Sequence, residues 1–165
     1  MTVSVRAAKT SDVTAIRRFL DFYAPKRILL DKPTVTLYED VQEFVVAEVD
    51  GAVVGCGALH VLWADLAEVR TLAVDPACQR SGIGHALLAA LLDRARGLGI
   101  RRVYCLTFEV DFFASHGFVA FDATPVEPEV YEELLRSYDE GVAEFLGLER
   151  VKPNILGNTR MLLEL

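Results

Sequence analysis

The sequence predicts an α/β fold in which helices flank a central mixed β-sheet. Short apolar runs with strand character alternate along the chain with segments whose apolar residues recur at helical spacing. The pair Asp50-Gly51 separates two apolar runs, which is a strong signal for a β-hairpin. An apolar run ending at Val74 leads into a glycine-containing loop and then a long helical pattern. These three observations together favour a mixed sheet with a strand–loop–helix unit near its centre.

Six elements are predicted before that loop. They are, in order, a strand over residues 3–6, a helix between residues 11 and 25, a short helix over 34–41, hairpin strands over 44–49 and 52–62, and a strand over 66–74. Ser11 or Thr10 is expected to cap the first helix, because a hydroxyl oxygen accepts a hydrogen bond from an amide of the first turn. Pro25 is expected to end it, since proline disrupts a helix interior.

Six further elements are predicted from the loop onward. They are a long helix to about residue 98, a strand over 101–107, a short helix over 110–116, a strand over 117–121, an amphipathic helix over 127–145 and a strand over 159–164. Gly97 and Gly99 close the long helix. The apolar positions of the amphipathic helix are assigned to the core, with a dimer surface as the alternative: Tyr131, Leu134, Leu135, Tyr138, Val142 and Phe145.

Bulk properties limit the possible function. The chain of 165 residues is 52% apolar and has no repeat or linker, so a single domain over residues 1–165 is expected. A formal charge of −7 argues against nucleic acid as a partner. No apolar run reaches the ~20 residues that cross a bilayer, and the N-terminus lacks a signal-peptide core, so a cytoplasmic protein without a membrane partner is expected. The 3 cysteines lack metal-ligand spacing, so reduced thiols and no metal are expected.

The loop after Val74 carries the strongest functional signal. Gly82 and Gly84 let the backbone approach a ligand closely, and the amides at the start of the following helix have no intrahelical partner. Together with the helix dipole and Arg80, they predict a site for a phosphate or pyrophosphate. The dinucleotide fingerprint would require glycine at Leu87, and the Walker loop would require Gly-Lys-Ser/Thr. A glycine-rich turn that only starts a helix is the remaining alternative.

The stretch Gln79-Arg80-Ser81-Gly82-Ile83-Gly84, entered through Val-Asp-Pro, resembles the acetyl-CoA pyrophosphate loop of the GNAT N-acetyltransferase superfamily. The resemblance implies the GNAT fold, acetyl-CoA as co-substrate, and strands that splay beside the long helix to receive the pantetheine. Leu72 and Val74 would offer backbone groups. The cofactor-binding residues that it implies are Leu72, Ala73, Val74, Gln79, Arg80, Ser81, Gly82, Ile83, Gly84, His85 and Phe113. Whether Gln79 touches the cofactor or only stabilises the loop is open.

Glu68 is the candidate general base. Strand alternation is expected to put Glu68, Arg70 and Leu72 on one face, with the glutamate at the strand end opposite the phosphate loop. An amine that attacks a thioester must lose a proton, and a carboxylate in this position could take it through a water molecule. The alternative is an edge-strand glutamate that pairs with Arg70 for solubility.

Further segments, residues 54–59, 68–74, 106–118 and 157–162, resemble the acetyltransferase domain of N-acetylglutamate synthases, most closely the short stand-alone actinobacterial type. The resemblance implies that Glu68 is the base and that Thr107 is the candidate proton donor to the leaving thiolate. Phe112 and Phe113 stand where many GNAT enzymes have a tyrosine acid, which favours Thr107 or solvent. An arginine-binding kinase-like domain has no room here, so arginine inhibition is in doubt.

The family places acceptor contacts after the first helix and near the final strand, and the two carboxylates of glutamate require cations. The candidate substrate-binding residues are Lys32, Arg70, Thr71, Asn158, Thr159 and Arg160. The family's Arg-Arg-Ser-Lys reads Gly157-Asn158-Thr159-Arg160 here, so glutamine could also be accepted.

The resulting hypothesis is a cytoplasmic amino-acid N-acetyltransferase. It would move acetyl from acetyl-CoA to the α-amine of L-glutamate, with L-glutamine left open, in the first step of arginine biosynthesis. Attack would be direct, in a ternary complex, since no activated Cys or Ser arrangement is visible. The alternatives are a GNAT enzyme for another small amine or a protein N-terminus, and a non-catalytic acyl-CoA-binding sensor. A homodimer is an open possibility.

Overall fold

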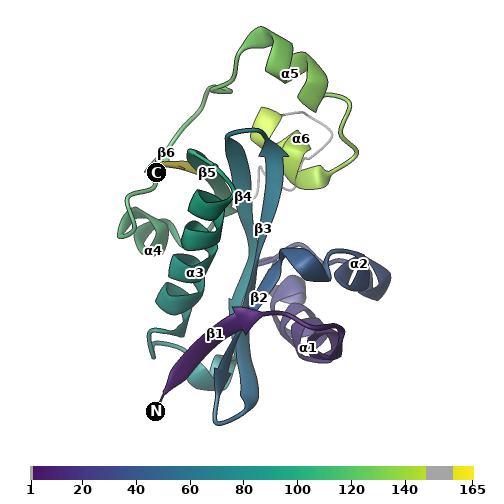
Figure 1. Cartoon of the computed structure of the whole chain (residues 1–165), viewed down its shortest axis with the longest axis vertical. Coiled ribbons are helices and arrows are strands. Elements are labelled where there is room, and N and C mark those ends of the chain that lie inside the picture. The colour runs from purple at the N-terminus through teal and green to yellow at the C-terminus, as the bar shows by residue number, and fades with distance from the viewer. Residues whose placement is uncertain (1, 148–157) are drawn as a thin grey trace. The chain divides into compact units, whose positions relative to one another are not determined.

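A computed structural model describes residues 2–147 and 158–165 of the chain (Figure 1). The structure divides into two compact units. The N-terminal unit comprises Met1–His60 and Val69–Leu98, and the C-terminal unit comprises Val61–Glu68 and Gly99–Leu165. Division into two compact units does not decide whether the chain is one domain, so the single domain over residues 1–165 stays a prediction.

The strands form a mixed sheet of seven strands in the order β1-β2-β3-β4-β5-β7-β6, which confirms the predicted fold class. Only the pairing of β4 with β5 is parallel among the registers assigned to the described strands. The strands are β1 Val3–Ala7, β2 Phe44–Val49, β3 Ala52–Trp63, β4 Leu66–Val74, β5 Arg102–Thr107, β6 Val119–Ala120 and β7 Thr159–Glu164. The α-helices are α1 Val13–Tyr23, α2 Thr34–Glu39, α3 Ile83–Gly97, α4 Val110–Ala114, α5 Pro128–Leu134 and α6 Glu140–Leu146.

In the N-terminal unit, α1 and α2 lie on one face of the strands and α3 lies on the other (Figure 1). The apolar stripe of α1, which includes Ile16 and Phe19, is buried against Phe44 and Val46 of β2. The hairpin between β2 and β3 turns at Asp50 and Gly51, as predicted. Both residues have positive φ, 50° and 78°, which is the type I′ geometry that suits the twist of paired strands.

The predicted cap of the first helix is wrong. Neither Thr10 nor Ser11 caps it, because a 3₁₀ turn over Thr10–Asp12 precedes α1. Asp12 Oδ2 accepts a hydrogen bond from the amide of Lys9 at 2.7 Å. The aspartate therefore holds the entry to the helix, one residue after Ser11 and two after Thr10, which have the usual capping propensity.

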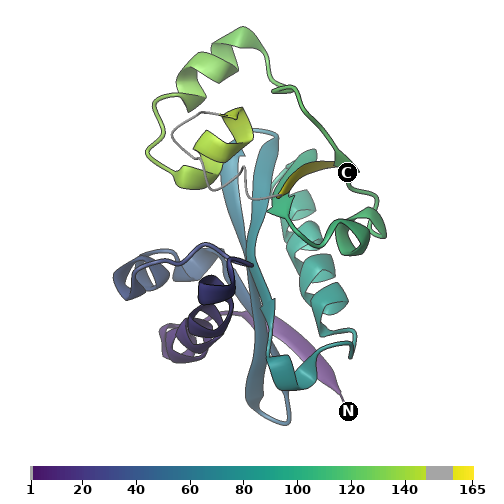
Figure 2. The ribbon, with the colours of Figure 1, turned by 180° about the vertical axis from the view of Figure 1, so that it is seen from behind.

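In the C-terminal unit, the predicted helix over 127–145 is two helices, α5 and α6 (Figure 2). Ser137 Oγ accepts a hydrogen bond from the amide of Asp139, and Asp139 Oδ1 accepts one from the amide of Val142, each at 3.1 Å. These side chains give the backbone an alternative to continuing the helix.

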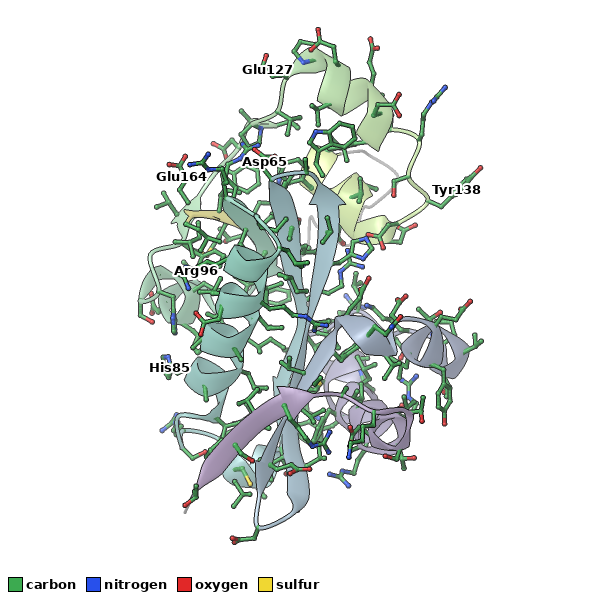
Figure 3. The ribbon with its side chains drawn as sticks, viewed as in Figure 1. Asp65, His85, Arg96, Glu127, Tyr138 and Glu164 are labelled. Carbon is green, nitrogen blue, oxygen red and sulfur yellow. The ribbon has the colours of Figure 1, made fainter. Side chains whose placement is uncertain are left out.

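The break also removes two residues from the predicted core. Tyr138 lies in the turn between the helices, points away from them in Figure 3, and is 97% exposed. Leu135 is 45% exposed. The remaining predicted positions lie in one apolar cluster built around Tyr104 of β5: Tyr131, Leu134, Val142 and Phe145.

Candidate active site

The start of α3 has the geometry expected of an anion site. Gly82 is the N-cap, with a φ of 81° in the left-handed region. The first intrahelical bond runs from the amide of Ala86 to the carbonyl oxygen of Gly82 at 3.1 Å. The amides of Ile83, Gly84 and His85 precede that bond and therefore have no acceptor inside the helix. Such a cluster of backbone donors at a helix N-terminus fits a phosphate or pyrophosphate.

The side chains around the loop fall into two groups. Arg80 and His85 are exposed, and His85 projects from the first turn of α3 in Figure 3. Asp75 and Ser81 shape the backbone instead. Asp75 Oδ1 accepts from the amide of Ala77 at 2.9 Å, and Ser81 Oγ donates to the carbonyl oxygen of Cys78. Arg80 is thus the loop's exposed cation, next to the donors of α3.

Gln79 is held by the fold. Its Nε2 donates to Tyr23 Oη at 2.7 Å, and that hydroxyl donates to the carbonyl oxygen of Val74 at 2.5 Å. Burial raises the pKa of Tyr23, so the phenol keeps its proton. The chain from Gln79 through Tyr23 to Val74 ties the loop to α1 and to the end of β4. Sequence reasoning counted Tyr23 only as an apolar helix position, and no local signal reveals partners more than fifty residues away.

Two glycines of β3 set the position of α3. An added methyl group at Gly55 would lie 2.9 Å from Leu87 Cδ1 and 3.0 Å from the carbonyl oxygen of Ala73. At Gly57 it would lie 2.9 Å from Leu91 Cδ1. The long helix therefore packs against the strand at positions where no side chain stands between them.

The predicted alternation along β4 is wrong beyond Arg70. Thr71 has a φ of 55°, a conformation that β-branched residues rarely adopt. Leu72 packs over Gly57, on the face of the sheet that α3 covers. Arg70 instead lowers the pKa of Asp40, a residue that follows α2 on the opposite face. The irregular residue therefore reverses the side-chain order, as a β-bulge does.

Lys32 and Arg70, both predicted substrate ligands, interact electrostatically with the carboxyl group of Asp40 in the N-terminal unit. The pKa of Asp40 is raised, first by burial and then by Glu43, while Lys32, His60 and Arg70 lower it. His60 Nδ1 lies 2.8 Å from Glu43 Oε2. Thr71 lies beside Arg70 in β4 and is buried. Lys32, Arg70 and Thr71, the acceptor contacts predicted for this unit, therefore belong to or adjoin this group of charged residues.

In the C-terminal unit, Glu68 is 4% exposed, which is unlike a solvated edge-strand glutamate. The parallel register between β4 and β5 covers Leu66–Glu68, and Glu68 is the partner of Tyr104. Its carboxylate is close enough to raise the pKa of both Tyr104 and Cys105. A buried carboxylate at the last paired position of β4 suits the predicted base.

The side chain of Thr107 projects from the other face of the sheet. Tyr104 and Leu106 of β5 pack in the apolar cluster that contains residues of α5 and α6, so alternation along β5 points Thr107 the opposite way. Thr107 is 8% exposed, and its Oγ1 accepts a hydrogen bond from the amide of Glu109 at 2.7 Å. Because the oxygen accepts through a lone pair, its own proton stays available for donation.

Among the acceptor contacts predicted near the final strand, Arg160 is the one engaged mainly with the protein itself. The guanidinium of Arg160 donates to the carbonyl oxygens of Phe145 at 2.7 Å and Asp122 at 3.2 Å and stacks 4.5 Å above the Phe121 ring. Within the part of the chain that is described, Arg160 Nε and Asn158 Oδ1 are buried without a partner. Thr159 pairs with Thr107 in the antiparallel register. Gly157 lies outside the described residues.

Other side chains argue against covalent catalysis by cysteine. Burial raises the pKa of Cys56 to about 12 and also raises that of Cys105. Both thiols therefore stay protonated near neutral pH. Phe113, a predicted cofactor contact, is buried in α4 with ring centroids 5.1 Å from Phe112 and 5.2 Å from Phe118.

Two absences concern residues 2–147 and 158–165 alone. Over these ranges no group of three or more His, Cys, Asp or Glu side chains is placed to hold a metal ion. No helix there is both long and apolar enough to cross a membrane.

A mixed sheet, a glycine loop at a helix start and a buried strand glutamate together define an acyl-CoA-dependent acetyltransferase fold, and residues 14–120 match the family described as "Acetyltransferase (GNAT) family". The chain belongs to this family. The resemblance inferred from the loop is therefore confirmed.

Individual relatives narrow the comparison. The chain is 63% identical to an "Amino-acid acetyltransferase" of Mycobacterium tuberculosis over 98% of this chain and 94% of the relative. It is 36% identical to an "Amino-acid acetyltransferase" of Neisseria meningitidis over 82% of this chain, but spans only 31% of that longer protein. The resemblance to the amino-acid acetyltransferases thus extends over nearly the whole chain.

Two solved structures have the same fold as this chain. The structure of Rv2747 from Mycobacterium tuberculosis in complex with CoA and NLQ matches with a TM-score of 0.94 and 62% identity, covering 98% of this chain and 99% of that one. N-acetylglutamate synthase from Neisseria gonorrhoeae, complexed with coenzyme A and N-acetyl-glutamate, matches with a TM-score of 0.79 and 28% identity, covering 100% of this chain and 35% of that one. Both relatives bind coenzyme A and a small molecule.

Proposed function

We propose that the protein is an amino-acid N-acetyltransferase that moves acetyl from acetyl-CoA to the α-amine of L-glutamate, with L-glutamine as a second acceptor. The reaction is the first step of arginine biosynthesis and takes place in the cytosol. The observation that carries the proposal is a complete anion loop together with a buried Glu68, in a chain 63% identical to an amino-acid acetyltransferase.

The loop residues fit the diphosphate of acetyl-CoA. The amides of Ile83, Gly84 and His85 bind its oxygens, and Arg80 adds a charged donor. Gln79 keeps the loop in place through Tyr23. Acetyl-CoA supplies the acetyl group as a thioester, whose carbonyl carbon is open to attack by an amine.

Glu68 takes the proton that the acceptor must lose. The ammonium form of an amino acid cannot attack, so a proton passes through water to the carboxylate before the new N–C bond forms. As the C–S bond breaks, the thiolate takes a proton from Thr107 or from solvent. The second proton, which the nitrogen loses on becoming an amide, replaces the one that Thr107 gave or passes to solvent. The buried thiols of Cys56 and Cys105 stay protonated and take no part in the proposed direct transfer.

Cations hold the acceptor's carboxylates. Lys32 and Arg70 are the proposed ligands from the N-terminal unit, with Thr71 beside them. Thr159 and Arg160 of β7 and Asn158, which precedes that strand, are the other proposed ligands. Arg160 already serves three backbone carbonyl groups, so its contribution would come through Nε, which the fold leaves without a partner among the described residues.

The test is Glu68→Gln, assayed by thiol release with a panel of amino acids and peptides. We expect turnover with glutamate to fall at least about a hundredfold while acetyl-CoA affinity stays the same. Glu129→Gln makes the same chemical change on an exposed carboxylate and should keep full activity. Equal turnover in Glu68→Gln and the wild type would remove Glu68 from the mechanism.

The panel also separates the rival functions. Preference for another amine or for a peptide N-terminus would identify a GNAT enzyme with a different acceptor. Binding of acetyl-CoA without turnover of any amine would identify a sensor.

A further inference from the structure

Tyr104 carries a deeply buried hydroxyl group that the mechanism above does not use. The residue lies in β5 and is 0% exposed. Its Oη has no hydrogen-bond partner within residues 2–147 and 158–165. Leaving a buried hydroxyl unpaired costs about 1–3 kcal/mol. A phenylalanine would fill nearly the same volume without that cost, so the hydroxyl calls for an explanation beyond packing.

The position of Tyr104 places that hydroxyl beside the proposed base. Glu68 and Tyr104 are direct partners in the parallel register. Neighbouring strands lie about 4.8 Å apart, and partners in register project from the same face. Edge-on contacts with Phe145, at 5.2 Å between centroids, and with Phe121, at 5.9 Å, fix the ring. The tyrosine is therefore a rigid neighbour of the glutamate.

The charges around Tyr104 decide which role its hydroxyl can play. It is faced by Glu68 from β4, Glu144 from α6, Arg160 from β7 and Cys105 on its own strand. Burial raises the pKa of Tyr104 most, the two carboxylates and Cys105 raise it further, and Arg160 alone lowers it. The phenol therefore keeps its proton and acts as a hydrogen-bond donor.

We propose that Tyr104 is a positioning residue whose hydroxyl donates a hydrogen bond to the water that carries the acceptor's proton to Glu68. This rests on the proposed function. The water accepts from Tyr104, takes one proton from the amine and gives one to the carboxylate, while the phenol keeps its own. A single water gives the Tyr104 hydroxyl its missing hydrogen-bond partner and links it to Glu68.

The test is Tyr104→Phe, with Tyr131→Phe as the matched control. Tyr131 is partly buried against the same apolar cluster, so its variant also loses one phenolic oxygen, but Tyr131 is not a register partner of Glu68. We expect Tyr104→Phe to lower kcat about tenfold, the equivalent of one hydrogen bond, at unchanged KM for acetyl-CoA. The acidic limb of its pH–rate profile should move to higher pH. Its Tm should stay close to that of the wild type, because the loss of one hydrogen bond to water is offset by the removal of one buried polar group. Tyr131→Phe should keep the wild-type kcat and pH profile.

Two results would overturn the proposal. One is a Tyr104→Phe enzyme with wild-type kcat and pH profile. The other is a fall in kcat that accompanies a lower Tm at an unchanged pH profile, which would mean a structural role. Failure of the proposed function looks different, because Glu68→Gln would then match the wild type or no amino acid would be acetylated.

Discussion

Asp12 ties three segments of the N-terminal unit together through one carboxylate. It accepts from the amide of Lys9 and from both terminal nitrogens of Arg6, at 2.8 and 3.0 Å. Arg6 also donates to Glu48 of β2. Asp12 is 6% exposed, so solvent screens these bonds little. Hydrogen bonds from Arg6 lower the pKa of Asp12 most, against the opposing effect of burial.

This lowered pKa predicts how stability depends on pH. The folded state favours the ionised carboxylate, so the stabilisation is fully present above the unfolded-state pKa of about 3.9. It is lost as the pH falls through the lower, folded-state value. Asp12→Asn should cost about 1–3 kcal/mol near neutral pH, and the difference from the wild type should shrink in acid. Urea unfolding at a series of pH values measures this.

Asp21→Asn is the matched control, since its carboxylate forms an i,i+4 pair with Arg17 but is 66% exposed. Exposed pairs contribute little, so this variant should stay within about 0.5 kcal/mol of the wild type. A difference between Asp12→Asn and wild type that stays constant down to pH 2 would contradict the prediction.

Among single residues, the sequence was most informative where a backbone requirement is local. Gly82 at the start of α3 and the pair Asp50-Gly51 in the hairpin both have positive φ, as their positions require. Residues that act through distant partners gave no signal. Tyr23 supports Gln79 across the N-terminal unit, and Tyr104 meets Glu68 only because two strands pair in one particular register.

At the scale of elements, the contact between β3 and α3 positions the loop. Gly55 lies against Leu87 and Ile83, in the first turns of the helix whose amides form the anion site. Gly55→Ala should cost about 1–3 kcal/mol, because the added methyl meets both a side chain and a backbone carbonyl oxygen. Displacement of the helix start should also raise the KM for acetyl-CoA. Chemical denaturation and initial-rate kinetics test the two effects.

Gly97→Ala serves as the control for this substitution. An added methyl at Gly97, the last residue of α3, meets nothing within 4 Å. Alanine has the higher helix propensity, so this variant should be neutral or more stable by up to about 1 kcal/mol. If Gly55→Ala and Gly97→Ala behave alike, the close contact does not position α3.

Elements were predicted well where periodicity alone decides. The bounds of β4 and β7 agree with the prediction, because their apolar runs have clear ends. The prediction of one helix over 127–145 was wrong. Ser137 and Asp139 accept hydrogen bonds from backbone amides in a turn, and the apolar periodicity gives no sign of that turn. The predicted alternation of side chains along β4 was wrong from Thr71 onward, because the backbone conformation of Thr71 is unusual for its residue type.

For the whole molecule, binding of an anionic cofactor depends on local groups, since the chain's formal charge is −7. Acetyl-CoA at about 100 times its Kd should stabilise the folded state by about 2.7 kcal/mol and raise the Tm. Arg80→Gln should weaken binding about tenfold or more, because a charge-assisted donor is lost. The rise in Tm at the same concentration should then be smaller, as differential scanning calorimetry would record.

Arg96→Gln provides the comparison, since Arg96 is also exposed but lies in the last turn of α3, at the end of the helix opposite the loop. It should keep the full rise in Tm. Equal rises in Arg80→Gln and the wild type would exclude Arg80 from cofactor binding.

The sequence by itself determined the class of fold, the strand–loop–helix unit and the family, because each depends on periodicity and on short motifs along the chain. The tertiary structure alone decided the burial of Glu68, the support of Gln79, the commitment of Arg160 to backbone carbonyls and the surroundings of Tyr104. The physical reason is that burial, register and electrostatic contact join residues far apart in the chain, and only the packed fold brings them together.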